Sequence, residues 1–134
     1  MFPSHSRFPS PGSPEAADHT ECIVVREILD RVGDKWSVLV IGLLGEEGRR
    51  FSELRRSIEG ISQRMLTLTL RQLERDGIVS RTVHATVPPR VDYALTPLGE
   101  SVLEPLTALT EWAQAHGTDV AEARRAYDET NAVS

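Results

Sequence analysis

Two consecutive prolines, Pro88 and Pro89, interrupt a stretch of the chain that otherwise alternates between apolar and polar residues. The alternation covers residues 78–84 on one side and 90–95 on the other, which is the period of a β-strand with one buried face. Proline has no backbone N–H for a sheet ladder, so the pair belongs at the tip of a hairpin. The sequence therefore predicts a two-stranded ribbon whose tip the prolines hold extended.

Helical patterns surround this hairpin on both sides. Apolar residues recur at helical spacing in residues 21–32, 35–44, 53–58, 63–76 and 97–115. The N-cap positions carry Asp34, Ser52, Ser62 and Thr96. The helix over 35–44 is apolar nearly all round, which predicts a buried centre, and Pro105 predicts a kink in the long helix. Two short helices joined by a tight turn and followed by a hairpin make a winged helix-turn-helix. The predicted class is mainly α with a small β-hairpin.

The chain length of 134 residues suits one domain. Residues 1–20 are rich in Pro and Ser, which predicts a disordered arm. Residues 21–116 are expected to form the winged helix-turn-helix domain. His116-Gly117 is expected to end the long helix, which leaves 117–134 as a polar helix or tail. We find neither a signal-peptide core nor a bilayer-spanning apolar run, so we expect a cytoplasmic protein without a membrane segment.

A net charge of −5 conceals an uneven distribution. Residues 49–90 carry nine arginines against four acidic residues, whereas the rest of the chain carries six basic against sixteen acidic residues. Such asymmetry indicates an anionic partner for the basic segment. Double-stranded DNA fits that description, and a solvated, Arg-rich surface is the alternative.

The helix over 63–76 has two distinct sides when it is wound at 100° per residue. Leu66, Leu70 and Leu73 form the side expected in the core. The opposite side gives the candidates for base readout, which are Gln63, Arg64, Thr67, Leu68 and Arg71. Arginine can bind guanine bidentately, and glutamine can bind adenine. Leu68 either packs on a thymine methyl group or is an ordinary exposed leucine.

Further polar residues are expected to contact the DNA backbone, which positions a protein without reading the sequence. These candidates are Arg49, Arg50, Ser52, Arg55, Arg56, Ser62, Arg75 and Arg81. The wing is expected to contribute Arg90 beside Pro88 and Pro89, because a stiff tip loses less entropy on binding.

Several motifs together resemble one family. They are "DRVGDKW" at 30–36, "RRFSELRRSIEGIS" at 49–62, "LRQLERDGIVSR" at 70–81 and "VPPRVDYALTPLG" at 87–99, with an N-terminal cysteine. The chain resembles the HxlR-type winged-helix transcriptional regulators, relatives of the MarR group. The resemblance implies a homodimeric repressor on a partly palindromic operator, with the first and last helices as the dimer interface. The interface residues expected here are Val25, Ile28, Leu29, Leu106, Leu109 and Trp112.

The resemblance also implies a signal, because some members sense thiol-reactive species through the N-terminal cysteine and others answer to small molecules. Cys22 is the single cysteine, which excludes an internal disulfide. It falls in the first turn of a predicted helix, where the positive potential favours a thiolate. The alternative is a small buried hydrophobe. The family often has proline after this cysteine, and Ile23 stands there instead.

Other chemistry finds little support in the sequence. The four histidines share no metal-ligand spacing, and we find neither a phosphate-binding glycine loop nor a nucleophile paired with a base. We therefore expect no enzyme activity, no metal and no cofactor. Trp36 is either a core anchor or the wall of a ligand pocket. The rival function is a winged helix that binds proteins without sequence-specific DNA binding.

Overall fold

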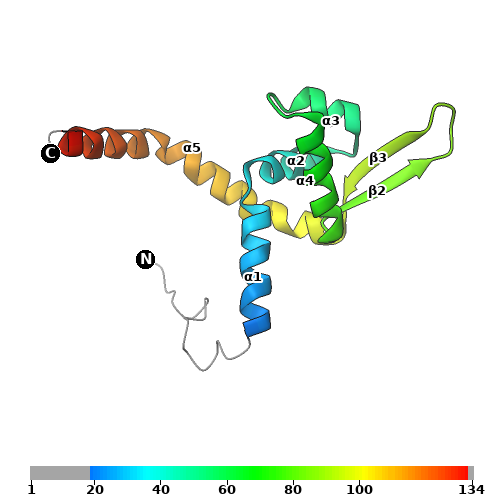
Figure 1. Ribbon diagram of the computed structural model, residues 1–134, viewed down its shortest axis with the longest axis horizontal. Coiled ribbons are helices and arrows are strands. Elements are labelled where there is room, and N and C mark those ends of the chain that lie inside the picture. The colour runs from blue at the N-terminus through cyan, green and yellow to red at the C-terminus, as the bar shows by residue number, and fades with distance from the viewer. Residues whose placement is uncertain (1–18, 133–134) are drawn as a thin grey trace.

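The computed structural model describes residues 19–132 (Figure 1). The elements in chain order are α1 (His19–Val32), α2 (Lys35–Glu46), β1 (Arg49–Arg50), α3 (Phe51–Ser57), α4 (Gln63–Arg75), β2 (Val79–His84), β3 (Arg90–Leu95) and α5 (Pro97–Ala132). The expected disordered arm over 1–20 lies outside the described residues, except that positions 19 and 20 already belong to α1. The order of elements is that of a winged helix-turn-helix, as predicted.

The sheet has three antiparallel strands in the order β1-β3-β2. The hairpin register runs from Val79 opposite Leu95 to His84 opposite Arg90, and β1 adds a strand through Arg50 opposite Asp92. Paired residues share a face of the sheet, and Val79 and Leu95 face the core. The opposite, outer face carries four polar residues: His84, Arg90, Asp92 and Arg50. The hairpin was predicted, whereas β1 is too short for an alternating pattern to indicate it.

The core gathers buried side chains from every layer. They are Val40, Ile41, Leu44, Leu54, Ile58, Ile61, Leu66, Leu70, Leu73, Ile78, Val79 and Leu106. Trp36 packs against this cluster, in line with an anchoring role, and the Lys35 ammonium lies 4.4 Å from its ring centre. Helix α2 contributes Val40, Ile41 and Leu44 to this buried centre, as predicted, but its apolar residues are not all buried, because Leu39 is 43% exposed. Only one side of α2 meets α4, α5 and β3.

Three of the four predicted N-caps are present. Asp34 Oδ2 accepts from the N–H of Ser37 (3.2 Å), Ser62 Oγ from Met65 (3.0 Å) and Thr96 Oγ1 from Gly99 (3.0 Å). The prediction for Ser52 is wrong, since α3 already begins at Phe51. The backbone N–H of Arg50 donates to Glu53 Oε1 at 2.9 Å, so the helix start is satisfied without a serine cap.

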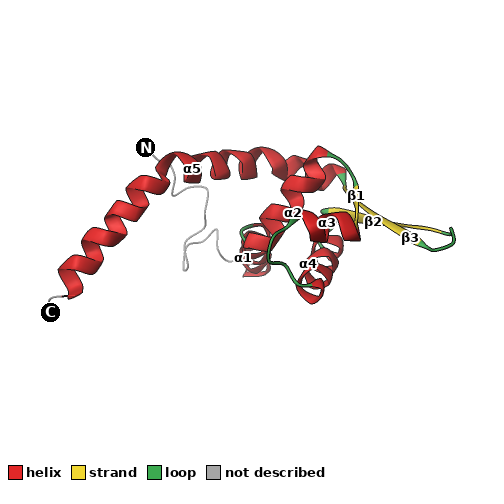
Figure 2. Cartoon of the chain, turned by 90° about the horizontal axis from the view of Figure 1, so that it is seen from above, coloured by secondary structure: helices red, strands yellow, loops and turns green. Residues whose placement is uncertain are grey.

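The last helix is longer than predicted. α5 runs unbroken from Pro97 to Ala132, so the expected end at His116-Gly117 is wrong. A single glycine costs only about 1 kcal/mol inside a helix. The His116 side chain spans the preceding turn, with Nδ1 2.9 Å from the carbonyl oxygen of Trp112 and its ring stacked on the indole. Figure 2 shows that α5 changes direction along its length.

Two helical arms extend from the winged-helix body. Figure 1 shows α1 and the C-terminal part of α5 projecting away from the other elements. Residues 23–30 of α1 are all exposed, as are residues 107–115 of α5. Within residues 19–132, no helix has the length and hydrophobicity needed to cross a membrane. The arms therefore leave large helical faces uncovered within one chain.

Candidate nucleic-acid interface

Helix α4 buries one side and exposes the other. Leu66, Leu70 and Leu73 are at most 2% exposed, which confirms the predicted core side. Thr69 is buried with them. Ser62 caps the N-terminus of the helix, and Gly77 ends it in the left-handed conformation (φ +77°) that glycine favours. Burial of the leucines fixes the rotation of the helix about its axis, with its polar side outward.

The outward side carries the five residues predicted for base readout. Arg64, Arg71 and Gln63 are exposed, Thr67 is half-buried and Leu68 is 46% exposed. These same five residues line an open depression on the surface of the body. The structure therefore places donors, an amide and an aliphatic group together on one accessible helix face.

Most of the predicted cationic residues remain available to an anion. Among the described residues, all five arginines of α3 and α4 lack an ion pair or side-chain hydrogen bond: Arg55, Arg56, Arg64, Arg71 and Arg75. Ser52 and the side chain of Arg50 are also exposed near the start of α3. The accessible positive charge of the basic segment is therefore concentrated on α3 and α4, the two helices of the helix-turn-helix.

Arg49 does not belong to this set. Its side chain is only 18% exposed, its Nη2 lies 2.8 Å from Glu46 Oε1, and its Nε donates to the carbonyl oxygen of Leu43 at 3.4 Å. It is opposite Tyr93 in the sheet and so faces inward. The expected phosphate contact is therefore not available in this arrangement, and Arg49 secures the end of α2 instead. Arg81 lies 3.6 Å from Glu74 on the surface, a pair too exposed to hold it firmly.

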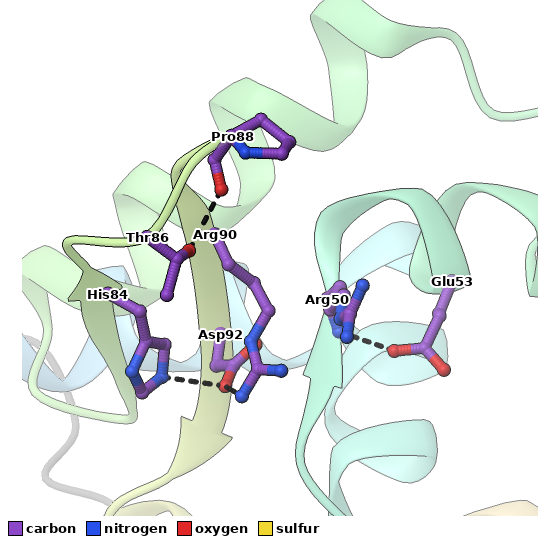
Figure 3. Close-up of polar contacts among 7 residues, drawn as sticks. All are labelled: Arg50, Glu53, His84, Thr86, Pro88, Arg90 and Asp92. Carbon is purple, nitrogen blue, oxygen red and sulfur yellow. Dashed lines mark hydrogen bonds and ion pairs between the residues drawn. The ribbon is translucent and has the colours of Figure 1, made fainter.

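The wing carries a small charged cluster that the sequence analysis missed (Figure 3). Asp92 Oδ2 lies 2.9 Å from His84 Nε2 and accepts from Arg90 Nη2 at 3.1 Å. Desolvation raises the pKa of Asp92, but the hydrogen bond with His84 and the positive charge of Arg90 outweigh it, and the pKa is lowered from 3.8. The three side chains meet because the register pairs His84 with Arg90 and places Asp92 two residues further along β3. That register depends on the loop, so sequence alternation alone did not reveal the cluster.

The tip of the wing differs from the predicted extended segment. The chain bends at Val87 and Pro88, where the peptide bond is cis, and Thr86 Oγ1 donates to the carbonyl oxygen of Pro88 at 2.8 Å. A hairpin loop must reverse the chain, so a wholly extended tip was not compatible with the ribbon. Below the tip, burial raises the pKa of Tyr93, which packs on the core and anchors β3.

The residues predicted for dimerisation lie on the two arms, with one exception. Val25, Ile28 and Leu29 on α1 are 39%, 49% and 52% exposed, and Leu109 and Trp112 on α5 are 58% and 55% exposed. Leu106 is 8% exposed and belongs to the core of its own chain, so it is not available to a partner.

Cys22 lies in the first turns of α1 and is partly buried. It therefore lies on the same helix as the exposed apolar residues Val25, Ile28 and Leu29, near the N-terminal end that is far from the body. In the described part of the chain, no three metal-ligating side chains come together.

A helix-turn-helix with an open basic face, flanked by a β-ribbon, defines the class of winged-helix transcriptional regulators. The chain belongs to the HxlR-like helix-turn-helix family, whose model matches residues 31–121. It is 44% identical over 99 residues to the HTH-type transcriptional regulator YtfH of Escherichia coli, covering 74% of this chain and 79% of that protein. This family consists of transcriptional regulators rather than enzymes.

Solved structures agree with this assignment. The transcriptional regulator ytfH from Salmonella typhimurium superposes with a TM-score of 0.70 at 40% identity, over 75% of this chain and 90% of that one. The redox regulator HypR in its oxidized form superposes with a TM-score of 0.64 at 42% identity, over 68% of this chain and 94% of that one. The predicted fold class and family are thus confirmed.

Proposed function

We propose that the protein is a sequence-specific DNA-binding repressor that acts as a homodimer on a partly palindromic operator. The observation that carries the proposal is the outward face of α4, where the five candidate readout residues line one open depression. Arg64 and Arg71 have no intramolecular ion pair there and can approach guanine bidentately. Arg55 and Arg56 of α3 and Arg75 of α4 are exposed and can supply charge for phosphates.

The homodimer is supported by the exposed apolar residues of the two arms. Isoleucine, leucine and tryptophan side chains that are about half exposed lie along α1 and α5, away from the core. So many large apolar side chains exposed on two helices are typical of an interface. A second copy would bury the arms and place two α4 helices on one side of the duplex, about one helical turn apart.

The experiment is DNA binding as a function of salt. A dimer with about six to ten phosphate contacts should lose roughly 10³–10⁵ in affinity between 50 and 200 mM salt. The Arg64→Ala/Arg71→Ala double variant should abolish the preference for a duplex that the wild type has selected from a random pool. The matched control is Arg124→Ala/Arg125→Ala, which removes the same charge from the far end of α5 and should keep that preference. A winged helix that only binds proteins would show weak DNA binding and no steep salt slope.

Cys22 is proposed as the sensor of thiol-reactive compounds. It is partly buried on the arm that carries the exposed apolar residues, and the chain is 42% identical to a redox regulator over the superposed region. Oxidation or alkylation there would place a polar or bulky group beside the proposed interface. Diamide should release the wild type from DNA and leave Cys22→Ser bound. Equal loss in both proteins, or no loss in the wild type, would make Cys22 a structural residue.

A further inference from the structure

One ion pair joins the α1 arm to the end of the DNA-facing helix. Arg31 Nε lies 2.8 Å from Asp76 Oδ2, across 45 positions of the sequence. Arg31 is in the last turn of α1, and Asp76 is the C-cap residue of α4. Both side chains are largely shielded, at 22% and 28% exposure, so the pair is better held than a surface ion pair.

The electrostatics of α4 favour a cation at this place. The C-terminus of a helix carries partial negative charge, and Asp76 adds a carboxylate to it. Arg31 supplies the compensating charge from another element. Its guanidinium is planar and always charged, so it holds a directed contact. The pair therefore fixes where the base of α1 lies relative to the end of α4.

The rest of α1 is poorly fixed within one chain. Residues 23–30 are exposed, and the helix ends at Val32, which packs against the core just before Gly33 begins a turn. Figure 1 shows α1 projecting from the body at this junction. Contacts at the base of α1 must therefore set the direction of the whole arm.

We propose that the Arg31–Asp76 ion pair determines which half-site spacing the dimer accepts, by fixing the angle between α1 and α4. The inference rests on the proposed function, in which α1 contacts the partner subunit and α4 contacts DNA. Arg31 and Asp76 are then positioning residues that touch neither the bases nor the partner. They set the separation and relative rotation of the two α4 helices.

The length of α1 converts a small change of angle at its base into a large displacement at its far end. A helix of 14 residues is about 21 Å long at 1.5 Å per residue. A tilt of about 10° at its base moves the far end by roughly 3.6 Å, whereas one base pair of B-DNA rises about 3.4 Å. A change of about 10° in the angle between α1 and the body would therefore shift the two subunits by about the rise of one base pair.

The test measures binding to three duplexes. The first is a duplex that wild-type dimer selects from a random pool, and the others have one base pair removed from or added to its centre. We expect the wild type to lose about tenfold in affinity on either altered duplex. Arg31→Gln and Asp76→Asn should each bind all three duplexes within about threefold of one another. The charge-swapped double variant, Arg31→Asp with Asp76→Arg, should recover most of the wild-type preference.

The control is Arg26→Gln, which removes the same charge from an exposed position of α1 and should keep the wild-type spacing preference. Circular dichroism and sedimentation should show all variants folded and dimeric. The proposal is overturned if Arg31→Gln and Asp76→Asn keep the tenfold preference, or if the wild type accepts all three spacings equally. Failure of the proposed function looks different, because the wild type would then select no duplex or sediment as a monomer.

Discussion

Arg64, Arg71 and Arg90 have the same side chain but occupy different electrostatic settings. Arg64 and Arg71 stand on the outward side of α4 without an ion pair, whereas Arg90 donates to Asp92 on the wing. In the proposed complex the first two would face base edges, and the third would meet the backbone through a guanidinium that Asp92 already orients. Position in the fold, rather than residue type, therefore assigns the expected roles.

Alanine substitutions should separate these roles. Arg71→Ala should cost about 1–3 kcal/mol of binding free energy and relax the preference at one base position. Arg90→Ala should weaken binding to every sequence alike and reduce the salt slope by about one. Fluorescence anisotropy with selected and random duplexes at several salt concentrations measures both quantities. A change in base preference on Arg90→Ala, with random DNA unaffected, would contradict the assignment.

The lowered pKa of Asp92 predicts how the stability of the hairpin depends on pH. Its pKa in the folded protein is below 3.8, so the cluster's contribution to hairpin stability is fully present above pH 3.8. That contribution is lost as the pH falls through the lower folded value and the carboxylate is protonated. Carboxyl NMR titration should give a midpoint below 3.8 in the wild type. Arg90→Ala should raise that midpoint, and an unchanged midpoint would mean that Arg90 does not stabilise the carboxylate.

At the scale of elements, α5 begins against the turn that ends α4. Thr96 caps α5 and also donates its hydroxyl to the carbonyl oxygen of Ile78 at 3.2 Å. Gly99 lies in the first turn, where a Cβ atom would overlap that same Ile78 carbonyl group. The junction therefore requires close backbone approach, which only glycine permits.

Two glycine substitutions in α5 should have opposite effects. Gly99→Ala should reduce the free energy of unfolding by about 1–3 kcal/mol, because the backbone contact must open. Gly117→Ala, where a Cβ meets nothing within 4 Å, should raise it by up to about 1 kcal/mol through helix propensity. Urea unfolding of both variants measures the difference. No gain from Gly117→Ala would indicate that α5 is not continuous through that position.

At the scale of the whole molecule, a compact body carries two arms with uncovered apolar residues. A single chain buries Leu106 but leaves Leu109 and Trp112 more than half exposed on the same helix. The body therefore ends within α5, and the remainder of that helix is available to a second copy.

Disrupting one arm should dissociate the dimer without unfolding the body. Ile28→Glu, at a position 49% exposed, should raise the dimer dissociation constant at least about tenfold, because it places a charge in an apolar interface. Leu68→Glu is the matched control, since Leu68 is similarly exposed at 46% but lies on the α4 face. Sedimentation at micromolar concentration should show monomers for the first variant and dimers for the second. Dimers in both would place the interface elsewhere.

The winged helix-turn-helix could be predicted from the sequence alone, because its signals are local. Alternation gave the hairpin, periodicity gave the helices, and Asp34, Ser62 and Thr96 marked the helix starts that the structure has. The outward face of α4 followed from the same periodicity, since rotation about a helix axis is fixed once one side is buried. The family followed from several motifs at fixed spacings and is matched over residues 31–121.

Which charged side chains are unpaired, and where α5 ends, could not be predicted without the packing of the elements in space. Arg49 and Arg55 look alike in the sequence, yet one is held by Glu46 and the other is unpaired among the described residues. The His84–Asp92–Arg90 cluster depends on strand register, and the Arg31–Asp76 pair joins residues 45 positions apart. Contacts of this kind form between elements that are distant in the sequence and close in space. They therefore produce no local pattern of residues from which they could be predicted. The continuity of α5 also could not be predicted locally. Gly117 lowers the stability of the helix only modestly, and the backbone hydrogen bonds along α5 outweigh that cost.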